Sequence, residues 1–287
     1  MATPQVQNDP IYNLPFLYIT GLQLLYPASQ TLDLTAGQCR DSNDVMDLVI
    51  GSPNFAGQLT PAPVSIYIGA NGLNGLDTGS PAANTMYSIF LIGDSRYYQP
   101  TGAIVSLASN TQPLMPLGYD SYRLIGYWPT DGSANFVVGD IAYSANSSYR
   151  RMIYSTPIAT PIASGSSTSY ATVNLTGIVP IVEPGAESTN TPPFPLPIGN
   201  FIAQIYTSYV PNAAGNNLQL AGVYKDGGGN FQAQITGQVG SVPVTTVSDV
   251  WVNNLVVSSV LSPVIRYKVS SASDTVAISV AGFSYAL

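Results

Sequence analysis

Short runs of alternating apolar and polar residues, separated by glycine, proline, asparagine or aspartate, follow one another along most of the chain. Residues 31–35, Thr-Leu-Asp-Leu-Thr, show the pattern plainly, and apolar side chains at every second residue are typical of a strand with one buried face. No segment keeps a helical period long enough to predict a helix. The pattern therefore predicts an all-β protein. In the first half of the chain we expect strands at residues 22–26, 31–35, 45–50, 64–68, 85–92, 103–107, 121–128 and 136–143.

The amino-acid composition changes at residues 156–169, whose sequence is TPIATPIASGSSTS. This segment has few bulky side chains and much Pro, Ser and Thr, as is typical of a linker. We therefore predict an N-terminal β domain at residues 16–155, a linker at 156–169 and a C-terminal domain at 170–287. The fold class expected is two β-sandwich or jelly-roll-like domains, the second an antiparallel sandwich. The role of its Pro-rich loop, residues 183–199, stays open.

The first fifteen residues contain Pro4, Pro10 and Pro15. Proline lacks an N–H group and favours extended geometry in the residue before it. Residues 1–15 are therefore predicted to form an extended N-terminal arm. Two interpretations of this arm stay open, a loose terminus and a segment draped over a partner.

The composition supports strands over helices and excludes two classes of partner. Charged residues make up 8% of the chain and hydrophobic residues 45%, whereas exposed helix faces are normally filled with charged side chains. The formal net charge is −7 and the one adjacent basic pair is Arg150 and Arg151, so the chain lacks the basic face that nucleic acid requires. The apolar stretch at residues 11–26 is interrupted by polar residues and proline, which argues against a membrane span.

The residue types needed for most catalysis are missing from the sequence. There is no histidine, which removes the commonest general base, the commonest metal ligand and every Ser–His or Cys–His pair. The only glutamates, Glu183 and Glu187, fall in the Pro-rich loop, whereas a glycan-cleaving site needs two opposed carboxylates on a rigid frame. Cys39 is the single cysteine and is expected to be a small buried side chain. We predict that the protein is not an enzyme and uses no cofactor.

Two sets of residues remain as candidates for binding. Asp41, Asp44 and Asp47 form the densest cluster of oxygen-bearing side chains and are a weak candidate for calcium, although a solvated turn before a strand explains the spacing equally well. Several of the nineteen tyrosines lie in turn-rich regions, where they suit sugar stacking or interface anchoring, although packing on a sheet is the commoner role. The tyrosines in question are Tyr97, Tyr98, Tyr119 and Tyr122.

An ordered series of motifs occupies residues 32–42, 74–79, 84–92, 106–109, 113–119, 122–126 and the closing strand at 276–285. This series resembles a group of phage and prophage virion proteins, the tail fibre or minor structural proteins of tailed bacteriophages. The arm before residue 16 and the insertion at 183–199 depart from this pattern.

The resemblance implies that the protein is a component of the virus particle, and it implies no catalytic activity. We expect a tail fibre or tail appendage subunit that assembles in the host cytoplasm, is exposed on the virion and forms a homo-oligomer, with a trimer as the family expectation. Its N-terminal region would attach to tail proteins such as the adaptor or nozzle. Two alternatives stay open, a head decoration or cement protein, and a receptor-binding module whose second domain recognises a host surface glycan.

Overall fold

The computed structural model describes a chain whose regular elements are all β-strands, so the prediction of an all-β protein is confirmed. None of the described residues belongs to a helix that is long and apolar enough to cross a membrane. The predicted arm at residues 1–15 and the loop at 183–199 lie outside the described residues. The structure describes residues 18–53, 57, 59–108, 112–143, 149–174, 200–213, 216–222, 233–236, 246–251, 255–256 and 264–286.

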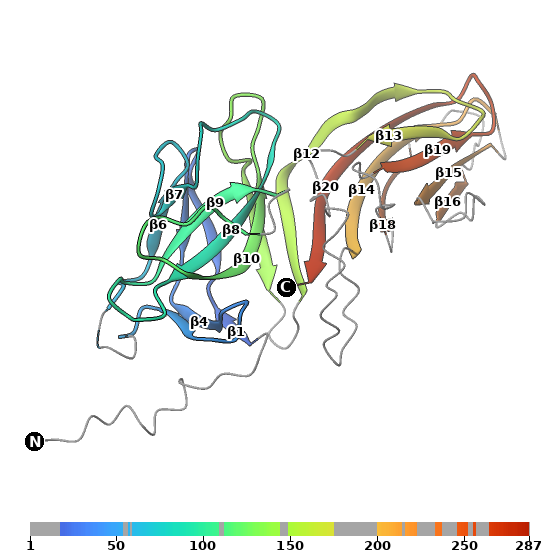
Figure 1. The fold of residues 1–287 in the computed structure, drawn as a ribbon. Coiled ribbons are helices and arrows are strands. Elements are labelled where there is room, and N and C mark those ends of the chain that lie inside the picture. The colour runs from blue at the N-terminus through green and yellow to red at the C-terminus, as the bar shows by residue number, and fades with distance from the viewer. Residues whose placement is uncertain are drawn as a thin grey trace, which may run out of the picture. The chain divides into compact units, whose positions relative to one another are not determined.

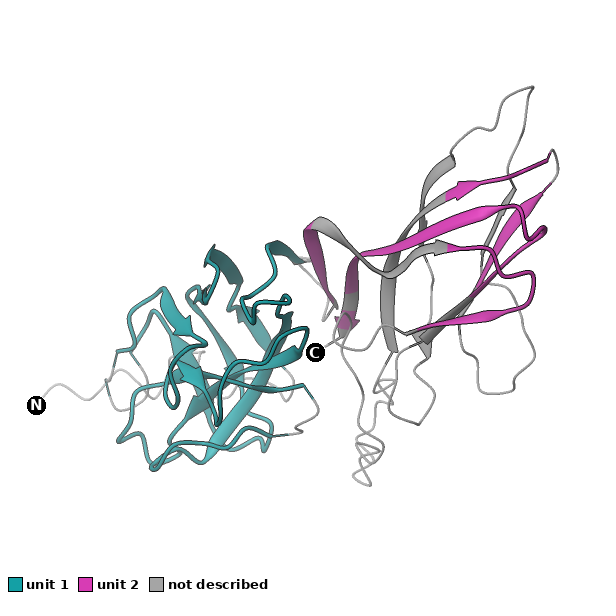
Figure 2. Cartoon of the chain, turned by 90° about the horizontal axis from the view of Figure 1, so that it is seen from above, with its two compact units in different colours: residues 1–148, 287 teal, residues 149–286 magenta. Residues whose placement is uncertain are grey.

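The chain divides into two compact units (Figure 2), and each is described separately below. Unit 1 comprises residues 1–148 with residue 287, and unit 2 comprises residues 149–286. The strands of unit 1 are β1 (Ile19–Gly21), β2 (Leu24–Ala28), β3 (Thr31–Leu34), β4 (Gly37–Arg40), β5 (Asp47–Ile50), β6 (Val64–Tyr67), β7 (Gly75–Leu76), β8 (Met86–Gly93), β9 (Gly102–Leu107), β10 (Ser121–Pro129) and β11 (Gly139–Tyr143).

The described strands of unit 1 include three small sheets, of order β1-β4-β5, β2-β3-β6 and β10-β8-β9-β7 (Figure 1). Pairing is antiparallel except between β7 and β9. β6 alternates between buried and exposed residues, as expected of a strand with one covered face. Every residue of the central strand β8 is buried. A strand covered on both faces is apolar along its length, which explains the unbroken run Ile89–Ile92.

A close approach of two backbones requires glycine where β1 meets β4. Gly21 and Gly37 pair directly in the register of the two strands. A Cβ atom on Gly37 would overlap Leu22 N and Thr20 O, and it would lie 2.8 Å from the carbonyl carbon of Gly21. The sequence predicts a turn at Gly37, but the residue begins a strand, because glycine also permits close approach of backbones.

We expect Gly37→Ala to lower the free energy of unfolding of unit 1 by about 2–3 kcal/mol, because the strand pair must separate to admit the methyl group. Denaturant unfolding followed by circular dichroism measures the change. Gly132→Ala is the matched control, since the nearest atoms to its Cβ lie 4.0 Å away. Equal stability of the two variants would contradict the proposed role of Gly37.

Unit 2 contains longer strands in two sheets. The larger sheet includes the order β12-β20-β14-β17, with β18 also paired to β14, and the smaller has the order β13-β19-β15-β16. β12, β20 and β14 are visible in Figure 1 as long curved strands. The strands are β12 (Tyr149–Gly165), β13 (Ala171–Asn174), β14 (Asn200–Val210), β15 (Asn217–Gly222), β16 (Ala233–Thr236), β17 (Thr246–Trp251), β18 (Leu255–Val256), β19 (Val264–Val269) and β20 (Thr275–Ala286).

The prediction of a linker at residues 156–169 is wrong over residues 156–165. These residues belong to β12, which pairs with β20. The two prolines that suggested a linker lie at irregularities of the strand. The register shifts between Ile153 and Ile158, where Pro157 lies, and again between Ile158 and Ile162, where Pro161 lies. Proline is tolerated in a sheet at such bulges, where its missing N–H interrupts no regular pairing. The boundary between the units lies earlier, after residue 148.

Candidate interaction surface

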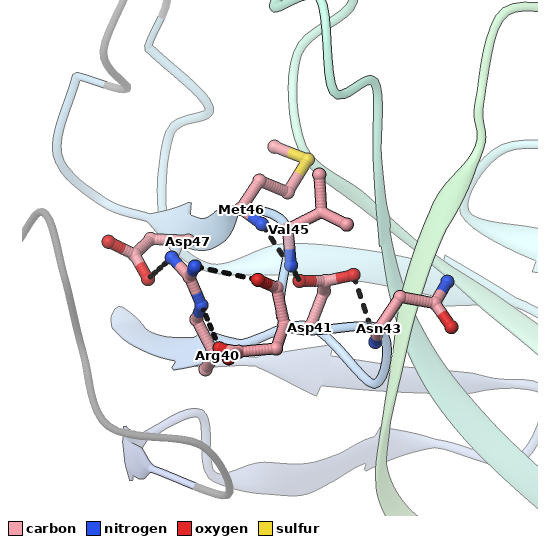
Figure 3. A network of polar contacts seen from close by, with 7 residues as sticks. Arg40, Asp41, Asn43, Val45, Met46 and Asp47 are labelled. Atoms are coloured by element: carbon pink, nitrogen blue, oxygen red, sulfur yellow. Dashed lines mark hydrogen bonds and ion pairs between the residues drawn. The ribbon is translucent and has the colours of Figure 1, made fainter.

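The acidic cluster predicted as a calcium site is used to hold a turn and an arginine (Figure 3). The Asp41 side chain is fully buried. Its carboxylate accepts hydrogen bonds from the backbone N–H groups of Asn43 at 3.1 Å, Val45 at 2.7 Å and Met46 at 2.8 Å. This satisfies the N–H groups of a tight turn between β4 and β5, as aspartate commonly does.

The other two carboxylates of the cluster bind Arg40 instead of joining Asp41. Arg40 Nε donates to Asp44 at 2.7 Å, and its Nη1 donates to Asp47 at 3.0 Å. Calcium requires several oxygen ligands that converge on one point. Among the residues that the structure describes, no group of three or more His, Cys, Asp or Glu side chains is placed to hold a metal ion. The calcium assignment of Asp41, Asp44 and Asp47 is therefore wrong.

The four tyrosines singled out in the sequence have different surroundings. Tyr119 and Tyr122 pack against the buried core cluster that includes Phe90. The Tyr122 ring meets Phe90 edge to face, with centroids 5.9 Å apart. Tyr97 is half-buried, whereas Tyr98 is 73% exposed. Of these four side chains, Tyr98 is therefore the one available for contact with a partner.

Tyr98 lies on a loop that a buried carboxylate holds in place. This loop, residues 94–101, joins β8 to β9, and its first residue, Asp94, is 1% exposed. Asp94 accepts hydrogen bonds from Arg96 N at 3.0 Å, from Arg96 Nε at 3.0 Å and from Tyr98 N at 3.1 Å. Burial by itself would raise the pKa of Asp94, but these hydrogen bonds and the charge of Arg96 lower it below its ordinary value. The carboxylate therefore stays ionised at neutral pH and keeps the loop rigid.

A second loop, residues 112–120, lies beside the first. Asp120 accepts hydrogen bonds from Ser95 N at 2.7 Å and Ser95 Oγ at 2.6 Å. The Tyr119 hydroxyl donates to Pro100 O at 2.9 Å. A Cβ atom on Gly118 would lie 3.4 Å from the Gln99 side chain, which places the two turns in contact.

The second loop carries an apolar side chain that is wholly open to solvent. Leu117 is 101% exposed, and Leu114 is 64% exposed in the same loop. The first loop carries Arg96, with its side chain 60% exposed and its guanidinium 5.7 Å from the centre of the Tyr98 ring. We call Arg96, Tyr98, Leu117 and Asp120 the two-loop surface.

The chemistry of the two-loop surface suits binding. It presents an aromatic ring, an aliphatic side chain and one charge of each sign on loops held by hydrogen bonds, and tyrosine and arginine contribute strongly to protein contacts. Sequence reasoning identified Tyr98 as one of four candidates but missed Leu117. The signal available was Pro-Leu-Gly at residues 116–118, which predicts a turn and puts its middle residue at the tip.

No family model, curated protein or solved structure matches this chain.

Proposed function

We propose that this chain is a non-enzymatic structural subunit of a tailed bacteriophage particle, specifically a tail fibre or tail appendage subunit that assembles with other copies of itself. The sequence resemblance set out above supplies the link to the particle. The structural observation that carries a non-catalytic role is how the buried carboxylates are used. Asp41, Asp94 and Asp274 are each at most 1% exposed.

These three carboxylates are bound by hydrogen-bond donors of neighbouring turns and so serve the fold. Asp41 and Asp94 accept backbone N–H groups of the turns that follow them. Asp274 accepts the Tyr209 hydroxyl at 3.0 Å and Asn212 N at 2.7 Å. A catalytic acid or base must reach the proton it transfers in a bound substrate, and carboxylates buried among turn N–H groups are poorly placed for that.

Three finer features belong to the same proposal. The two units would be sandwich or jelly-roll-like domains, which agrees with their several antiparallel sheets. The oligomer would be a trimer, and the N-terminal region would attach it to tail proteins such as the adaptor or nozzle. Low charge and abundant tyrosine suit large contacts between subunits, where charged residues are depleted and aromatic residues enriched.

Deletion of residues 1–15 tests the attachment. We expect the shortened protein to fold and keep the wild-type mass in solution, while its incorporation into particles falls to background. Quantitative immunoblotting of purified particles measures incorporation, and labelled antibody in electron micrographs locates the wild-type subunit. Normal incorporation of the deletion variant would contradict attachment through this region. A label confined to the head would contradict the tail assignment.

A further inference from the structure

We propose that the two-loop surface, Arg96, Tyr98, Leu117 and Asp120, is where one copy of this chain contacts a second copy. The inference rests on the proposed function, from which it takes self-assembly, and it adds the surface that performs it. Three properties of the described residues carry it, namely the rigidity of the loops, the exposure of their apolar groups and the distribution of charge in unit 1.

Hydrogen bonds within the single chain hold both loops in place. Asp94 binds the N–H groups of Arg96 and Tyr98, and Asp120 binds Ser95 through both its backbone and its hydroxyl. Association normally costs free energy to order loops and side chains at the interface. A surface whose loops are held by internal hydrogen bonds avoids part of that cost, which favours binding.

The exposed groups are of the kind that dominate binding energy. Tyrosine and arginine are enriched among the residues whose removal weakens complexes most. Tyr98 is 73% exposed and Leu117 is 101% exposed. Both therefore present apolar surface to solvent.

The charges of unit 1 favour a second copy as that molecule. Between residues 18 and 143 the sequence has nine aspartates and three arginines, so two copies repel each other over most of this unit. Of the three arginines, Arg40 is 15% exposed in its side chain and Arg123 is 5% exposed. Arg96, at 60%, is the one widely exposed cation of the described part of unit 1.

The exposed carboxylate of Asp120 belongs to the same surface as Arg96. In a ring such as a trimer, each contact runs from one copy to the next, so the two sides of the contact surface must be complementary. With one cation and one carboxylate on the two-loop surface, Arg96 of each copy is matched by Asp120 of the next while the Tyr98 and Leu117 side chains meet between them. Such pairing gives orientation and specificity, and the apolar contact gives affinity.

The variant L117D places a carboxylate at the centre of this contact. We expect it to weaken self-association by about 30-fold or more, as for loss of a residue central to an interface. Sedimentation velocity of the full chain over a range of concentrations measures the association constant. V138D is the matched control, because Val138 is 51% exposed in the same unit and is not part of the surface.

A cross-linking experiment tests the same contact without adding charge. The single native cysteine, Cys39, is fully buried, so L117C supplies one accessible thiol per chain. A disulfide forms only between residues whose Cα atoms come within about 7 Å of each other. We expect mild oxidation to give covalent dimers with L117C and none with V138C.

Unchanged association of L117D, or an equal loss with V138D, would overturn the inference, as would equal cross-linking of both cysteine variants. Normal self-association of L117D combined with lost incorporation into particles would assign the surface to a different protein and also overturn it. Binding of host polysaccharide that Y98A abolishes while association is unchanged would assign it to a glycan instead. The proposed function fails independently, if the wild-type protein is absent from purified particles.

Discussion

Replacing Trp128 by alanine is expected to lower the free energy of unfolding of unit 1 by about 3–5 kcal/mol, the usual loss for a large aromatic side chain in a core. Trp128 is 0% exposed. Its ring stacks on Tyr26, with centroids 6.5 Å apart and planes inclined by 14°. Its Nε1 donates a hydrogen bond to Val137 O at 2.9 Å. The substitution removes the packing and the bond together and leaves a cavity.

Two comparison variants separate these contributions. Trp128→Phe keeps an aromatic ring but loses the donor to Val137, and we expect it to cost about 1–3 kcal/mol, the range for an unsatisfied buried polar group. Tyr98→Ala removes an exposed aromatic side chain of the same unit, and we expect a change within about 0.5 kcal/mol. Urea unfolding followed by circular dichroism measures all three. If Trp128→Ala lowered the free energy of unfolding as little as Tyr98→Ala, Trp128 would not be part of a packed core.

Replacing Asp274 by alanine is expected to destabilise unit 2 by about 3 kcal/mol or more, because several donors lose a charged acceptor and a buried donor left unsatisfied costs about 1–3 kcal/mol. Asp274 is 0% exposed. Besides Tyr209 and Asn212, its carboxylate accepts hydrogen bonds from Asn216 Nδ2 at 2.6 Å and Ser271 N at 3.1 Å. Four donors, from two parts of the chain far apart in the sequence, would lose their acceptor.

The same network makes unit 2 sensitive to acid. Burial by itself would raise the pKa of Asp274, but the hydrogen bonds from Asn212, Asn216, Tyr209 and Ser271 lower it below the ordinary value of 3.8. A carboxyl whose pKa is lower in the folded state contributes stability that is fully present above the unfolded pKa and lost as the pH falls through the folded pKa. Wild-type unit 2 should therefore lose stability as the pH falls below about 4, and this part of the loss should be missing in Asp274→Ala.

Thermal unfolding at neutral pH and at a series of pH values below 4 measures both effects. Asp131→Ala is the control, because Asp131 is an exposed turn residue that accepts hydrogen bonds from Ser133 N and Asn135 N. It should cost about 1 kcal/mol or less. If Asp274→Ala were as stable as this control, or lost stability with acid as steeply as the wild type, the described network would not be the cause.

These buried aspartates show how a chain with few charges uses them. Asp41, Asp94 and Asp274 each bind backbone N–H groups in a turn, so the acidic residues organise connections between strands. Some apolar and aromatic side chains lie at the surface, as Tyr98 and Leu117 do. Few charges and exposed aromatic side chains agree with the proposed role in contacts between subunits.

The sequence by itself determined the all-β character of this protein, because the alternation of residues 31–35 and 64–68 and the glycine, proline and aspartate between strands act locally. It also predicted Tyr98 as one of four candidate contact residues. Tertiary structure decided the rest. Residues 156–165 form a strand because β20, more than a hundred residues later in the sequence, pairs with them. Asp44 and Asp47 bind Arg40 because β4 and β5 are neighbours. The exposure of Tyr98 and Leu117, and the partial burial of Tyr119 and Tyr122, depend on which distant residues pack beside each one. Spacing along a single chain does not contain that information.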